Sequence, residues 1–184
     1  MKKGDQKYFL AIIPPEPLAG EITSIKKEFV EKYNSKASLR SPAHITLHMP
    51  FQWKERKEER LFNVLAQTSN FSPFNVELDG FGAFSPRTIF IQPKPCEELE
   101  AMNMELLEAT KKQLNLFHAV HIGGFHPHIT VAFRDLRKPM FFEAWKEFEQ
   151  RAFKASFQVN SFWLLKHNGK SWDAYREFNF CNSQ

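Results

Sequence analysis

His44-Ile45-Thr46-Leu47 and His128-Ile129-Thr130-Val131 are the two most informative stretches of this 184-residue chain. In each tetrad one apolar residue separates a histidine from a threonine, and a second apolar residue follows. Successive side chains of a β-strand point to opposite faces, so each histidine would share a face with its threonine while the apolar pair faces the core. If the two strands lie close together, two imidazoles and two hydroxyls converge on one site.

The elements predicted around the tetrads follow the same order in both halves of the chain. Each half reads as strand, helix, short strand, helix and strand, with an offset of about 80 residues. In the first half these elements are predicted at 8–13, 18–33, 44–49, 54–68 and 74–84. In the second half they are predicted at 88–92, 97–116, 128–133, 139–148 and 156–166, and a last strand at 171–180 follows the hairpin signal Asn168-Gly169.

This alternation of short strands and helices predicts an α+β fold. No linker rich in glycine or serine separates the halves, so we expect one domain over residues 1–184, built from two packed pseudo-repeat lobes at about 1–85 and 86–184. An apolar fraction of 42% supplies enough material for a core.

The chemistry that suits two His-x-Thr pairs is displacement at phosphorus. A neutral imidazole can take a proton from the attacking oxygen, and a protonated imidazole can give one to the leaving oxygen. Histidine has an unperturbed pKa of about 6.5, so both forms are accessible around neutral pH. The threonine hydroxyls can donate to the non-bridging phosphate oxygens as charge builds there. This scheme requires neither a metal nor a cofactor.

The segments around the tetrads, Ser41–Leu47 and His126–Phe133, resemble the signature of the 2H phosphoesterase superfamily. This superfamily includes 2′-5′ RNA ligase-like proteins and cyclic nucleotide phosphodiesterases. The stretch Gly82–Phe90 is similar to the entry into the second half in the RNA ligase-like branch, and the final hairpin is similar to the family's ending. The resemblance therefore covers nearly the whole chain.

The resemblance implies a bilobed fold in which two pseudo-symmetric antiparallel sheets, flanked by helices, enclose a central cleft. It implies His44, Thr46, His128 and Thr130 as catalytic and phosphate-holding residues. The implied reaction is hydrolysis of a 2′,3′-cyclic phosphate or of a 2′-5′ phosphodiester on RNA termini or small nucleotides, and its reversal would be 2′-5′ ligation. We expect His128 as the base and His44 as the acid, although the sequence does not fix this assignment.

Two alternatives stay open. One is a non-catalytic RNA- or nucleotide-binding module that uses the same cleft, and the other is a phosphodiesterase for a metabolite unrelated to RNA. A zinc site at His121, His126 and His128 is disfavoured, because zinc needs three or four converging ligands and His128 already has a role.

Further candidates for contact with substrate are His48, Arg87, Arg134 and Phe51. His48 shares a face with Thr46 if its strand continues, and Arg134 shares one with His128 if alternation persists. Phe51 could stack on a base. A solvated surface position is the competing interpretation for both arginines and for His48.

The composition adds weaker expectations. A net charge of +4 and a pI near 9.0 suit an anionic substrate without establishing one. The two cysteines, Cys96 and Cys181, stand far apart, which favours a reducing compartment. The apolar run at 8–13 is far shorter than the roughly 20 residues of a membrane span. We expect a soluble, cytoplasmic monomer without a membrane partner.

Overall fold

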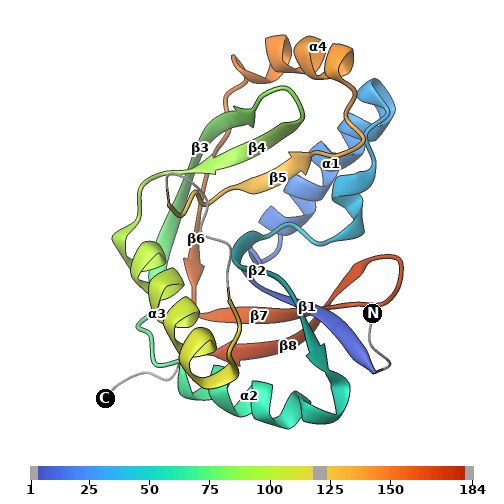
Figure 1. Ribbon diagram of the computed structural model, residues 1–184. Helices are drawn as coiled ribbons and strands as arrows, with labels where there is room; N and C mark the ends of the chain where they lie inside the picture. The colour runs from blue at the N-terminus through green and yellow to red at the C-terminus, as the bar shows by residue number, and fades with distance from the viewer. Residues whose placement is uncertain (1–3, 118–123, 181–184) are drawn as a thin grey trace.

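The computed structural model describes residues 4–117 and 124–180 (Figure 1). Its strands are β1 (Asp5–Ile12), β2 (Ile45–Lys54), β3 (Phe74–Phe84), β4 (Thr88–Pro93), β5 (Ile129–Ala132), β6 (Lys154–Val159), β7 (Ser161–His167) and β8 (Trp172–Asn179). Its helices are α1 (Leu18–Tyr33), α2 (Glu58–Gln67), α3 (Glu97–Leu114) and α4 (Lys138–Phe148), with short 3₁₀ turns at Ala37–Arg40 and Glu55–Lys57. The predicted α+β class is confirmed.

The eight strands of the described chain form one antiparallel sheet that curls along its length (Figure 1). Its order is β6-β3-β4-β5-β2-β1-β7-β8, so β5 and β2, the strands of the two tetrads, are neighbours at the centre. The two antiparallel sheets expected from the sequence are thus two four-stranded halves joined edge to edge.

The two halves of the sheet do not correspond to the two halves of the sequence. Strand β3 pairs with β4 and β6, while the closing strands β7 and β8 extend the half that begins with β1. The predicted single strand at 156–166 is wrong, because it contains β6, which pairs with β3, and β7, which pairs with β1. Only Asn160 separates these two strands, and no glycine or proline marks the break.

Helices cover one face of this sheet and also cross between its halves. Helix α1 packs against β5, and α3 packs against β2. The apolar residues of the tetrads, Ile45, Leu47, Ile129 and Val131, are at most 1% exposed and lie in the core beneath these helices. Their predicted core-facing orientation is confirmed, which leaves the histidines and threonines on the other face.

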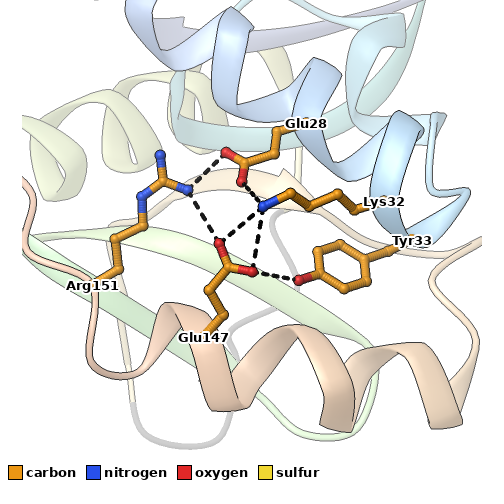
Figure 2. A network of polar contacts seen from close by, with 5 residues as sticks. All are labelled: Glu28, Lys32, Tyr33, Glu147 and Arg151. Atoms are coloured by element: carbon orange, nitrogen blue, oxygen red, sulfur yellow. Dashed lines mark hydrogen bonds and ion pairs between the residues drawn. The ribbon is translucent and has the colours of Figure 1, made fainter.

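A polar network joins α1 to α4 at the surface (Figure 2). Glu28 Oε2 accepts from Arg151 Nη1 at 2.7 Å, and Glu147 Oε2 accepts from the Tyr33 hydroxyl at 2.8 Å. Lys32 bridges Glu28 and Glu147 at 2.7 and 3.2 Å. Exposed ion pairs contribute little each, so we expect the network to add little to the stability of the fold. None of the described helices is long and apolar enough to cross a bilayer.

Candidate active site

The two tetrads meet around an approximate twofold axis. Ile45 of β2 pairs with Ile129 of β5 in antiparallel register. Extending this register by one residue places His44 across from Thr130 on one side of the pair. On the other side it places Thr46 across from His128. Directly opposed side chains of antiparallel strands lie about 4.5–5.5 Å apart at Cβ, so the four polar groups gather on one patch, where all four are half-buried.

A β-bulge interrupts β2 directly after its threonine. Strand β1 pairs Ala11 with Thr46 and Leu10 with His48, which leaves Leu47 as an extra residue. His48 is consequently turned inward and is only 1% exposed. The expectation that His48 lies beside Thr46 on the open face is therefore wrong, because the bulge breaks the strict alternation on which it rested.

Strand β5 carries the same irregularity at the equivalent place. Strand β4 pairs Phe90 with Thr130 and Ile89 with Ala132, so Val131 is the extra residue. Ala132 is 0% exposed, as the equivalence with His48 requires. Bulges are common next to functional sites, where they redirect side chains or end a strand's pairing. The two motif strands therefore have the same backbone irregularity directly after their threonines.

Buried polar contacts from the other half of the chain hold the first motif strand in place. Asn103 of α3 is 3% exposed and donates from Nδ2 to the carbonyl oxygen of Leu47, the extra residue of the bulge, at 2.6 Å. Such a bond satisfies a carbonyl that the sheet's ladder leaves unpaired.

Asp135, just beyond β5, ties the loop before β2 to the second half. Its Oδ1 accepts from the Ser35 hydroxyl at 2.9 Å, and its Oδ2 accepts from the backbone N–H groups of Lys36 and Ala37 at 3.0 Å each. Residues of the second half thus hold both the first tetrad and the loop that precedes it.

The two histidines make the same hydrogen bond. Nδ1 of His44 lies 2.8 Å from the carbonyl oxygen of Pro42, and Nδ1 of His128 lies 2.7 Å from that of His126. A carbonyl oxygen can only accept, so Nδ1 carries the proton in both rings. Nε2 is then the nitrogen that gains or loses a proton, and both imidazoles are oriented for acid-base work through it.

The environment of His44 favours its neutral form. Loss of solvation lowers the pKa of His44 to about 4, and repulsion from Lys26 and His128 acts in the same direction. The hydrogen bond to Pro42 opposes this shift. Lys26 is itself buried, with a pKa lowered to about 8, and its Nζ donates to the carbonyl oxygens of Ser38 and Ser41 at 3.2 and 3.1 Å.

We expect His44 to titrate near pH 4 in the free protein, measured from the imidazole proton resonances with His44→Ala for assignment. The unfolded chain binds this proton more tightly, so the folded state should lose stability as pH falls from about 6.5 towards 4. Inorganic phosphate should raise the pKa, because an anion favours the charged ring. Titration near 6.5 in the free protein would contradict the inferred desolvation.

Aromatic rings adjoin His44 on the site face. The ring of Phe9, 3% exposed, lies 4.9 Å from that of His44, and the ring of Trp172 lies 4.7 Å beyond it. Phe9 belongs to a small apolar cluster on this face, separate from the core beneath the helices. This cluster explains part of the desolvation of His44.

His128 is bordered by two phenylalanines that were not predicted as site residues from the sequence. The ring of Phe84 lies 5.1 Å from that of His128 in edge-to-face geometry, and the ring of Phe90 lies 5.2 Å away. The sequence of β4 did contain a signal for Phe90. Ile89 and Ile91 alternate with it and face the core, so Phe90 is an aromatic residue on the opposite face of the strand, where a polar residue is expected.

The other residues predicted to contact substrate, Phe51, Arg134 and Arg87, lie at three different places in the fold. Phe51 stacks on Tyr8 at 6.0 Å and joins the core on the helix-covered face, so the structure does not bring it to the site. Strand β5 ends at Ala132, and Arg134 has a left-handed backbone with φ 59°, so the predicted alternation does not extend to it. Arg87 is exposed in the β3–β4 turn, where its N–H donates to the Phe84 carbonyl at 3.1 Å.

Residue His121 of the disfavoured zinc site lies outside the described residues. Within 4–117 and 124–180, no three His, Cys, Asp or Glu side chains gather as a metal ion would need. A cavity of about 470 Å³ opens elsewhere, at the β7–β8 hairpin, and is lined in part by Lys166, His167 and Tyr175. Lys166 is already paired with Glu55 and Glu58, so this cavity has little attraction for an anion.

Comparison with known proteins identifies the arrangement. Among solved structures, E. coli LigT complexed with 3′-AMP has a TM-score of 0.69 and 19% identity, covering 98% of this chain and 99% of that one. TT0787 of Thermus thermophilus has a TM-score of 0.68 and 18% identity, covering 97% and 100%. These likenesses show the fold. No curated protein sequence gives a significant match. The model of the 2′-5′ RNA ligase superfamily matches residues 14–171, and this chain therefore belongs to that superfamily.

Proposed function

We propose that this protein is a two-histidine phosphoesterase that hydrolyses 2′,3′-cyclic phosphates or 2′-5′ phosphodiester bonds at RNA ends or in small nucleotides. The observation that carries the proposal is the pair of equivalent His–Thr units. Both histidines have Nδ1 fixed by a backbone carbonyl at 2.7–2.8 Å, and the strand register sets each histidine opposite the other strand's threonine. Two identical proton carriers on either side of one position suit in-line displacement.

The proposed reaction on a 2′,3′-cyclic phosphate needs one proton acceptor and one donor. A neutral histidine takes a proton from water through Nε2 while the water oxygen bonds to phosphorus. One ring P–O bond breaks, and the other histidine, protonated, gives its Nε2 proton to the departing ribose oxygen. Thr46 and Thr130 donate hydrogen bonds to the non-bridging oxygens as negative charge accumulates. If the 5′-hydroxyl of a second RNA end takes the place of water, the same displacement forms its O–P bond while the ring P–O bond to the 3′ oxygen breaks, which is 2′-5′ ligation.

The lowered pKa of His44 favours this residue as the proton acceptor in the free protein. This is the reverse of the assignment expected from the sequence. The acidic limb of kcat/KM reports the base of the free enzyme. It should lie near pH 4 if His44 is the base. A limb well above pH 4 would contradict His44 as the base.

A nucleotide substrate is supported by the relatives of the chain. E. coli LigT has been crystallised with 3′-AMP, NADP+ and ATP, which places nucleotides in a protein of this fold. The basic net charge of +4 also suits an anionic ligand.

The test is incubation of the purified protein, in EDTA, with 2′,3′-cyclic mononucleotides, a 2′-5′ dinucleotide and a short RNA ending in a cyclic phosphate. Products are followed by phosphorus NMR, and their shifts distinguish 2′- from 3′-phosphates. Turnover that persists in EDTA supports the proposal, and inhibition by EDTA contradicts the acid-base scheme. If a folded protein binds 3′-AMP but turns over none of these substrates, a binding module or a different phosphodiester is favoured.

A further inference from the structure

We propose that Phe84 and Phe90 form the surface on which the nucleobase of the substrate stacks, on the His128 side of the site. This inference rests on the proposed function, because it names how that same site selects nucleotides. Phe84 ends β3 and Phe90 lies in β4, so both belong to the strands next to the motif strand β5.

The first observation is the combination of contact and exposure at Phe84. Its ring lies 4.6 Å from Phe90 and 5.1 Å from His128, yet 46% of the residue is exposed. Phe90 beneath it is only 8% exposed. An aromatic ring that is supported from one side and open to solvent beside a catalytic histidine offers a stacking surface, and every base has a face that can use it.

The second observation is a glycine that makes room for this arrangement. A Cβ on Gly82 would lie 2.4 Å from Cε2 of Phe90, closer than any tolerated contact. Gly82 is the cross-strand partner of Phe90, so the ring of Phe90 lies across β3 over the glycine. The absence of a side chain at Gly82 therefore makes the space that the Phe90 ring occupies beside Phe84.

The third observation is the asymmetry between the two sides of the site. On the His44 side the adjoining ring is Phe9, which is only 3% exposed because other apolar side chains pack on it. Phe84 makes a similar ring contact with His128 at 5.1 Å, but 46% of the residue is exposed. Its turn also presents the exposed Arg87, whose charge suits the phosphate of a bound nucleotide. The base is thus assigned to the His128 side.

The experiment compares Phe84→Leu with the parent on two substrates, 2′,3′-cyclic AMP and glycerol 1,2-cyclic phosphate, which has no base. Phe142→Leu is the matched control, because Phe142 lies on α4 and is also 46% exposed. We expect Phe84→Leu to lower the ratio of kcat/KM for the two substrates by about 10- to 100-fold, while Phe142→Leu leaves it unchanged.

Equal losses on both substrates would overturn the inference and leave Phe84 as a positioning residue for His128. Unchanged kcat/KM on both substrates would also overturn it, with the base bound elsewhere. If the parent turns over neither substrate, the proposed function fails instead. Stacking is then tested by calorimetric binding of 3′-AMP and of ribose 3-phosphate, where Phe84→Leu should weaken only the first.

Discussion

Replacement of either His44 or His128 by alanine should lower turnover of a 2′,3′-cyclic nucleotide about 10²- to 10⁴-fold. The two rings are expected to act in one displacement, one as acceptor and the other as donor, so loss of either removes half of the proton transfer. The double variant should then be little slower than the slower single variant, because residues that act as a unit are not additive. Steady-state rates by phosphorus NMR or chromatography measure the effect.

The control for these variants is His167→Gln, which changes a histidine that packs on Trp172 and is given no role in proton transfer. It should keep the parent's turnover. Thermal unfolding shows whether each variant folds. Binding of 3′-AMP should survive in the single variants if the threonines still hold the phosphate. Substantial turnover by a folded His44→Ala or His128→Ala protein would contradict the paired acid-base scheme.

Two features were predictable because they depend on local sequence patterns. They are the order of strands and helices, and the inward orientation of the apolar residues in each tetrad. Alternation along a strand places Ile45 and Ile129 inward whatever the neighbouring strand is, and both are 0% exposed. The stripe of apolar residues over 18–33 predicted α1 with its observed limits for the same reason.

The failures occur where one strand's geometry depends on its partner. A bulge is defined by the register of two strands, so nothing in the single segment 44–49 reveals that His48 turns inward. The division between β6 and β7 depends on two different partners, β3 and β1, at distant places in the sheet. The contacts of Phe84 and Phe90 with His128 likewise arise only when β3, β4 and β5 are assembled.

The central strand pair explains how two similar tetrads can contribute to one site. Each tetrad alone offers one histidine and one threonine, too few for acid, base and phosphate contacts. Antiparallel pairing at Ile45 and Ile129 unites the tetrads, and the register puts unlike residues opposite each other. The environments are not equal, however: burial lowers the pKa of His44 to about 4, and Lys26 lies on its side of the axis. In the proposed mechanism, this difference would give distinct proton-transfer roles to two histidines at corresponding positions of the paired strands.

Thr46→Val and Thr130→Val are each expected to lower kcat about 10²- to 10³-fold, the usual effect of losing one donor to a developing oxyanion. Valine keeps the volume and β-branching of threonine, so the strands should retain their stability. The effect should fall mainly on kcat, because the hydroxyl's hydrogen bond strengthens as charge builds in the transition state. Thr23→Val serves as the control, since that hydroxyl bonds to Ala19 within α1.

The approximate twofold axis between the motif strands also predicts how the effects of the two threonine variants compare. If Thr46 and Thr130 hold the same phosphate from opposite sides, their effects on kcat should agree within about tenfold, and Thr→Ser at either position should restore most of the rate because the donor returns. A loss confined to KM would instead show that the hydroxyls hold substrate and transition state equally. A large effect at one position only would show that the phosphate sits off the axis, nearer one sheet half, and the symmetric phosphate contact would have to be abandoned.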